Sequence, residues 1–137
     1  MKRTFLYIII AALVIMVISM AIFMVTVYPK IKEQADVRKM AINDIPLSDI
    51  IDGTFRGDFN YGDFTYEVEV IVQEHIIKDI KILENRQDSE YARKATAVVN
   101  NVLKAQSLNV DVVTGATTTS KALLKAIENA LAKGFQE

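Results

Sequence analysis

The hydrophobic pattern separates an apolar N-terminal segment from a domain of mixed character. Residues 4–28 contain no charged side chain over 25 positions, which is long enough for a helix to cross a bilayer with some tilt. Tyr7 and Tyr28 lie near the two ends, where amphipathic rings favour the membrane interface. The run is longer than the apolar region of a secretory signal, and no small-x-small cleavage site follows it. The pattern therefore predicts an uncleaved transmembrane anchor over residues 1–28.

Residues 29–46 are predicted to form a helical stalk or linker. Pro29 follows the span, and the apolar positions between residues 30 and 43 lie among charged ones. Asp44-Ile45-Pro46 ends this pattern, because the residue before a proline resists the α conformation. A helix lying on the lipid surface is the alternative, although the segment has a weak amphipathic pattern and no aromatic residue.

From Gly53 the hydrophobic period changes to two, which is typical of half-buried strands. Residues 53–60 alternate loosely, a turn follows at 61–63, and residues 64–72 place apolar side chains on one face. In the third stretch, residues 76–83, Ile76, Ile80 and Ile82 are assigned to the inner face, and His75 to a solvated hairpin tip. The pattern predicts a three-stranded antiparallel meander with one solvated face.

Two helices and one short strand are expected after the meander. Residues 90–106 carry an apolar stripe at helical spacing, formed by Tyr91, Ala95, Val98, Val99, Val102 and Leu103. Residues 110–113 are read as a short buried strand, and a second helix runs from about residue 117 to a stop at Gly134. The predicted fold class is α+β, with an N-terminal transmembrane helix followed by a small antiparallel-sheet domain with two packed helices (residues 47–137).

Composition excludes several classes of function. The chain has no cysteine and one histidine, which excludes iron–sulfur clusters, zinc–cysteine sites and most histidine-ligated metals supplied by this chain alone. The 14 basic and 17 acidic residues after the span form no basic stripe, so nucleic acid is not an expected partner. No Ser/His/Asp or Cys/His set is available, so we assign no catalytic residue and no metal ligand. Redox chemistry would need an organic cofactor.

Basic residues flank both ends of the span and leave its orientation open. Lys2 and Arg3 precede it, and the segment after it contains Lys30, Lys32, Arg38 and Lys39. The positive-inside count is nearly tied, with a slight preference for a cytoplasmic C-terminal side.

The junction before the last helix offers a place for a phosphate. The apolar run at residues 110–113 is followed by Gly115, and four hydroxyl residues crowd the helix start: Thr117, Thr118, Thr119 and Ser120. Free N–H groups and the positive end of the helix dipole favour an anion there. A turn with an ordinary helix cap is the alternative that these residues alone leave open.

This junction closely resembles the flavinylation motif of the FMN-binding domain family, found in subunits of Rnf and sodium-translocating NADH:quinone reductase complexes and in small membrane-anchored proteins. The matching positions are Asp111, Thr114, Gly115, Ala116 and Thr117, followed by Thr119-Ser120 and a helix. The stretch Asp52-Gly53-Thr54-Phe55-x-Gly57 is similar to the opening strand of the family, and the resemblance covers about residues 47–133. Asn85, where many relatives carry a histidine, and His75, at a hairpin tip that is glycine-rich in the family, depart from the pattern outside the motif.

The resemblance implies FMN joined to the Thr117 hydroxyl as a phosphoester by a separate flavin transferase that uses FAD as donor. It implies that Asp111 and Thr114 brace the loop, with a part in the transferase reaction as the alternative for Asp111. Gly115 would let the backbone approach the phosphate, and small Ala116 would leave room for the transferase. Thr118, Thr119 and Ser120 would support the phosphate with hydroxyl and N–H groups.

The function implied is that of a membrane-anchored flavoprotein that relays electrons, a carrier rather than a stand-alone enzyme. Its expected partners are the membrane, the flavin transferase, and redox proteins or a quinone-linked membrane complex. The placement of the family implies a single-pass protein of the cell membrane with an extracytoplasmic domain, against the slight charge preference. Two alternatives stay open: a flavin reductase acting on a soluble acceptor, and a flavin-free structural or sensory module of a membrane complex.

Overall fold

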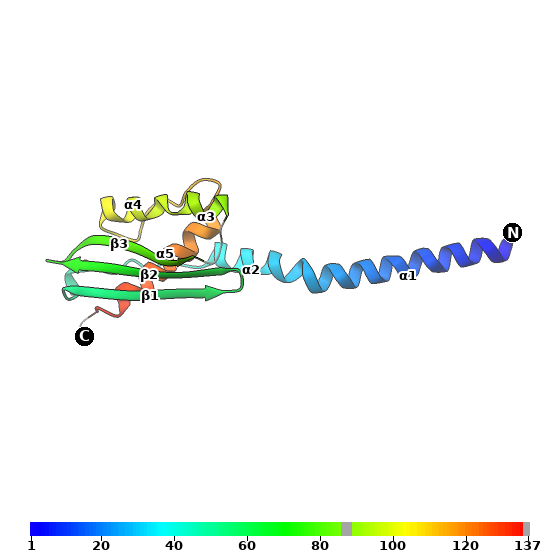
Figure 1. The fold of residues 1–137 in the computed structure, drawn as a ribbon, viewed down its shortest axis with the longest axis horizontal. Helices are drawn as coiled ribbons and strands as arrows, with labels where there is room; N and C mark the ends of the chain where they lie inside the picture. Colours follow the sequence, from blue (N-terminus) through cyan, green and yellow to red (C-terminus); the bar gives the residue numbers. More distant parts are fainter. Residues whose placement is uncertain (86–88, 136–137) are drawn as a thin grey trace. The chain divides into compact units, whose positions relative to one another are not determined.

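The structure, a computed structural model, describes residues 1–85 and 89–135 (Figure 1). Its contacts divide the chain into two units, Met1–Gln34 and Ala35–Glu137. The first unit is helical, with α1 (Lys2–Thr26) and the start of α2 (Tyr28–Lys39). No side chain of α1 is buried, and within the described residues one helix is long and apolar enough to cross a membrane. This agrees with the predicted anchor.

The second unit is built on the antiparallel meander that the sequence predicts. Its strands are β1 (Gly53–Tyr61), β2 (Phe64–Gln73) and β3 (Ile76–Asn85), in the order β1-β2-β3. Glu74 and His75 join β2 to β3 with φ angles of 54° and 58°. Two residues in this left-handed conformation form the kind of turn whose twist matches that of a hairpin.

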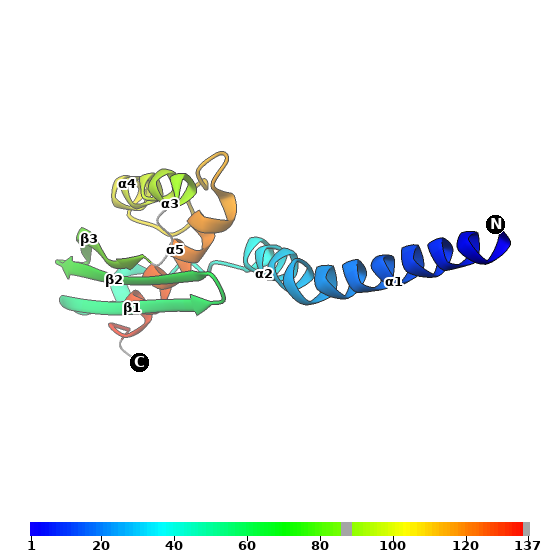
Figure 2. The ribbon, with the colours of Figure 1, turned by 45° about the vertical axis from the view of Figure 1, so that its right-hand side comes forward.

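One face of the sheet forms the core of this unit. The buried side chains of β2 alternate along the strand: Phe64, Tyr66, Val68, Val70 and Val72. Helix α5 (Thr117–Ala132) packs against this face, and Figures 1 and 2 show it crossing behind β1 and β2. At Gly57 a Cβ atom would overlap the backbone of Ala126 and Ala130, so this glycine lets the helix lie directly on β1.

The helix predicted over residues 90–106 is observed as α3 (Glu90–Ala95) and α4 (Ala97–Ala105). Thr96 separates them but keeps right-handed helical angles, and its hydroxyl donates to the Arg93 carbonyl at 2.6 Å. A bond of this kind, from a hydroxyl to the preceding turn, bends a helix. Helix α3 lies beside α5, and α4 lies beside both β3 and α5 (Figure 1).

Two predicted inner positions are wrong by one residue. Ile76 is 42% exposed, whereas Ile77 is buried, because an irregularity in the β2–β3 register moves the next residue to the core face. Tyr91 is 59% exposed, and Ala92 takes the buried position in the first turn of α3. The rest of the predicted helix stripe is buried or packed against the core.

Residues 35–46, most of the predicted stalk, belong to the second unit. Val37, near the end of α2, is fully buried, and the Tyr61 hydroxyl donates to the Asp36 carboxylate at 2.9 Å. Beyond α2, Asn43 donates from its backbone and side chain to the Glu128 carboxylate on α5, at 3.2 and 3.1 Å. By contacts the compact unit therefore begins at Ala35. The functional domain limits of 47–137 stay a prediction.

Candidate functional site

The segment that joins α4 to α5, residues 106–116, is called the junction loop here. It begins at Gln106, which ends α4 in the left-handed conformation with φ 53°. The Gln106 side chain accepts from the Ile77 N–H at 2.7 Å and donates to the Ile77 carbonyl at 3.0 Å. This amide therefore occupies part of the outer edge of β3 in the way that a neighbouring strand would.

The middle of the junction loop is extended but is not the strand that the sequence predicts at 110–113. Its valines pack partly against the core, and two of its backbone groups bond to side chains. The Asp111 carbonyl accepts from Asn101 Nδ2 at 3.2 Å, and the Val113 N–H donates to the Ser120 hydroxyl at 3.3 Å. A short apolar run has the same pattern whether or not a strand partner exists, so periodicity alone could not distinguish the two.

A tight turn closes the junction loop. The Ala116 N–H donates to the Val113 carbonyl at 2.9 Å, and Gly115 has φ +80°. This conformation favours glycine, and a Cβ added at Gly115 would meet no atom within 4 Å. The backbone at Gly115 therefore faces open space directly before α5.

Helix α5 begins with the four hydroxyl residues in two pairs. Thr117 is the first helical residue, and both Thr117 and Thr118 are partly exposed. Thr119 is 5% exposed and Ser120 is fully buried. Since the Ser120 hydroxyl accepts from the Val113 N–H, it acts on the junction loop from inside the protein.

The start of α5 leaves backbone donors open. The first α-helical bond runs from the Ser120 N–H to the Ala116 carbonyl at 2.8 Å, and Ala116 provides no side-chain cap. In the described part of the chain, the N–H groups of Thr117, Thr118 and Thr119 have no acceptor. The first turn also carries no acidic residue. Unpartnered N–H groups at the positive end of a 16-residue helix favour a bound anion.

The structure changes the roles expected for three motif residues. Asp111 and Thr114 are exposed, and among the described residues their side chains make no hydrogen bond to the loop. The loop backbone is bonded instead by Asn101, by Ser120 and by Asp44, whose carboxylate accepts from the Leu108 N–H at 2.8 Å. Ala116 is 3% exposed, so its methyl group packs inward and does not border an approach path. The bracing residues lie in other parts of the sequence, and the motif gave no signal for them.

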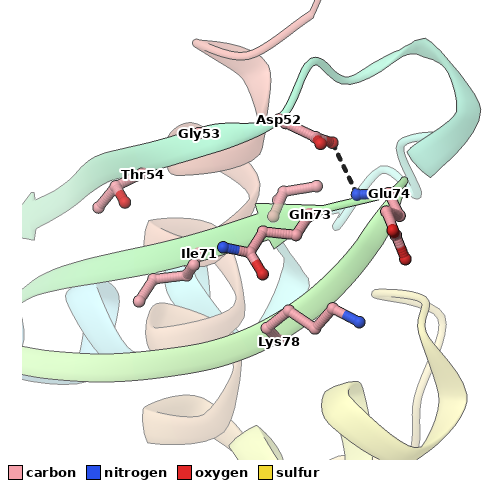
Figure 3. A pocket seen from close by; sticks show the side chains of 8 residues that line it. Asp52, Gly53, Thr54, Ile71, Gln73, Glu74 and Lys78 are labelled. Atoms are coloured by element: carbon pink, nitrogen blue, oxygen red, sulfur yellow. Dashed lines mark hydrogen bonds between the residues drawn. The ribbon is translucent and has the colours of Figure 1, made fainter.

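A separate pocket of about 460 Å³ lies at the β2–β3 hairpin (Figure 3). Charged side chains of Asp52, Glu74 and Lys78 line it, and Asp52 accepts from the Glu74 N–H at 2.7 Å. None of the motif residues contributes to it, and Figures 1 and 2 show α5 beginning at the other end of the sheet. The mixed charges do not define one kind of ligand, so the pocket is not our candidate site.

His75 at the same hairpin is exposed, as predicted, but it also holds a neighbouring segment. Its Nδ1 lies 3.1 Å from the carbonyl oxygens of Leu47 and Ile50, at the ends of a short 3₁₀ helix (Leu47–Asp49). Two acceptors require a proton on Nδ1. The described residues contain no cluster of His, Cys, Asp or Glu suited to a metal ion.

Comparison with known proteins points to one family. The model of a family described as the FMN-binding domain matches residues 60–132, which is more than half of the chain. The matched range includes the junction loop and all of α5. No curated protein matches the chain.

Proposed function

The chain belongs to the FMN-binding domain family, and from this premise we propose that it carries FMN covalently on Thr117 and relays electrons at the extracytoplasmic face of the cell membrane. Membership makes the chain an FMN-binding flavoprotein. The covalent linkage, the electron relay and the side of the membrane are the proposed part. One observation carries the linkage: a partly exposed threonine hydroxyl stands at the first position of a helix whose leading N–H groups have no acceptor in the described chain.

The residues present fit a phosphodiester bridge between FMN and Thr117. The single negative charge shared by its two non-bridging oxygens would find the N–H groups of Thr117, Thr118 and Thr119 in a single helical turn. Gly115 leaves the space before them open, and the partly exposed Thr118 adds a hydroxyl donor. With no acidic side chain in the first turn of α5, nothing there repels the phosphate.

The supporting residues hold the turn in front of Thr117. Ser120 accepts from the Val113 N–H, and Asn101 donates to the Asp111 carbonyl, so the backbone that leads into the tight turn has two fixed partners. FMN, when attached, supplies reversible uptake and release of electrons, and the protein supplies tether and orientation. A covalent tether also retains the cofactor where free FMN is scarce.

The membrane side is the part of the proposal that comes from the placement of the family. The charge count across the span is nearly tied, so the side is set in the proposal by the placement of the family. The flavin transferase and the domain must then meet outside the cytoplasm, with redox proteins or a quinone-linked membrane complex as electron partners.

The experiment is co-expression of the full chain with a flavin transferase, followed by denaturing electrophoresis and intact mass measurement. We expect in-gel flavin fluorescence and a mass increase equal to FMN less one water. Thr117→Ala is expected to abolish both, whereas Thr118→Ala, the matched neighbour, keeps them. Absence of flavin from the wild-type chain, or retention of bound flavin by Thr117→Ala after denaturation, contradicts the proposal.

A further inference from the structure

We propose that Asp44 is a positioning residue for flavin attachment: it lies outside the motif and holds the start of the junction loop. This inference rests on the proposed function. In the proposed transfer, a P–O bond forms to the Thr117 oxygen, the pyrophosphate bond of FAD breaks, AMP leaves and the hydroxyl proton is released. The loop that precedes Thr117 must then fit the transferase.

Both carboxylate oxygens of Asp44 bind the junction loop. Oδ1 accepts from the Leu108 N–H at 2.8 Å, and Oδ2 accepts from the Ser107 hydroxyl at 2.8 Å. The Ser107 oxygen in turn accepts from the Asn109 N–H at 3.0 Å. Hydrogen bonds to an ionised acceptor are stronger than neutral ones. One carboxylate therefore fixes three consecutive loop residues, 107–109.

Asp44 is itself held by the helix that begins at Thr117. The Lys121 ammonium donates to the Met40 carbonyl at 2.9 Å, and Asn43 donates twice to the Glu128 carboxylate. Lys125 also donates to Glu128, at 2.8 Å, so this largely buried carboxylate is paired. The segment before Asp44 is thus tied to α5 at two positions.

These contacts connect the junction loop back to α5, the helix that begins at the attachment residue Thr117. Helix α5 holds residues 40–43, Asp44 holds residues 107–109, and the junction loop returns through the tight turn to the first residue of α5. The Asp111 side chain makes no hydrogen bond or ion pair among the described residues. The position of this first motif residue therefore depends on the Leu108 contact before it and on the Asn101 contact at its own carbonyl.

The test compares Asp44→Ala, Asp44→Asn and Asp49→Ala in the full chain in detergent, with purified flavin transferase and FAD. Asp49 is the matched control, since it is also exposed and accepts from a serine hydroxyl, Ser48, at 2.9 Å, but it does not touch the junction loop. Intact mass gives the rate of FMN addition.

We expect FMN addition to Asp44→Ala to be slower than to the wild type by roughly fivefold or more. Asp44→Asn, which retains an acceptor for the Leu108 N–H, and Asp49→Ala should stay within about twofold of wild type.

Hydrogen exchange of the unmodified chain gives a second readout that does not depend on flavin. Asp44→Ala should speed exchange within residues 107–113 by about fivefold or more, with β2 and the second half of α5 unchanged. The inference is overturned if Asp44→Ala adds FMN and exchanges the amides of residues 107–113 at wild-type rates. It is also overturned if exchange is faster throughout the chain, because that indicates global destabilisation. If Asp44→Ala does not fold, Ser107→Ala replaces it. If the wild-type chain accepts no FMN, the proposed function fails, and the exchange result alone decides whether Asp44 positions the loop.

Discussion

At the residue scale, Tyr66 differs from the rest of the core because it carries a buried polar atom. Its side chain is fully buried on β2, and its hydroxyl has no hydrogen-bond partner among the described residues. Burial raises the pKa of the Tyr66 phenol to about 12, because the charged form is disfavoured away from water. An unpartnered hydroxyl in this position costs about 1–3 kcal/mol of stability. Tyr66→Phe should therefore be as stable as the wild type or more stable at neutral pH.

The raised pKa also predicts a loss of stability at high pH. The unfolded chain releases the Tyr66 proton near pH 10, whereas the folded chain keeps it until about pH 12. Between these values the unfolded state binds fewer protons, so the free energy of unfolding falls with rising pH by about 1.4 kcal/mol per unit. Urea unfolding at pH 9 and pH 11, followed by circular dichroism, should show this extra loss in the wild type and not in Tyr66→Phe. Equal losses in the two proteins would contradict a buried, neutral phenol.

Gly115 gives a second prediction at this scale. With φ +80°, it occupies a conformation that disfavours residues with a Cβ, although a Cβ would meet no neighbouring atom. Gly115→Ala should therefore cost about 1 kcal/mol through backbone strain alone, and Gly115→Asn should cost less, since asparagine tolerates positive φ. Chemical denaturation of the three proteins measures the difference. An alanine variant as stable as the wild type would mean that the turn adopts another conformation.

Burial of single residues is predicted correctly from the sequence in β2 but not at the start of β3. The alternation in β2 predicts its buried side chains correctly because β2 is the central strand and follows one period throughout. In β3 the irregular register next to Val72 places Ile77 inside and Ile76 outside. The residue types on the two sides are the same, so the pattern carries no signal for the shift.

At the element scale, the contact between Gln106 and the edge of β3 is testable. Gln106→Ala removes three side-chain hydrogen bonds, two to Ile77 and one to the Leu103 carbonyl. The loss should be about 1–3 kcal/mol, because the Ile77 N–H and carbonyl lose their partner. Gln106→Gly loses the same bonds but relieves the positive φ, so it should be less destabilising by about 1 kcal/mol. Urea unfolding compares the pair, and identical stabilities would show that the conformation of Gln106 is not strained.

The elements that the sequence predicts well are those with a long, regular pattern. The meander and the last helix fall at the expected residues, whereas residues 110–113 are not a strand because none of the three described strands pairs with them. The candidate site follows the same rule. Its contiguous part, from Gly115 to Ser120, forms the turn and helix start expected from local sequence. Its supporting contacts come from Asp44, Asn101 and Gln106, which only the fold brings to the junction loop.

At the scale of the whole molecule, the compact unit and the family match have different limits. The match covers residues 60–132, but the compact unit begins at Ala35. The residues between them include buried Val37, Asn43 bonded to Glu128, and Asp44 bonded to the junction loop. A spacer between anchor and domain would leave few such contacts. Residues 35–46 therefore belong to the folded unit in physical terms.

Two N-terminal truncations test this conclusion together with the anchor. The full chain should remain in the membrane pellet after an alkaline wash, because its apolar helix is long enough to span. The fragment 35–137 should be soluble and folded. The fragment 47–137 loses the buried Val37 side chain and the Asn43 contacts, so its free energy of unfolding should be lower by at least about 2 kcal/mol. Equal free energies of unfolding for the two fragments would show that residues 35–46 are a spacer. Release of the full chain from the membrane by alkali would contradict the transmembrane anchor.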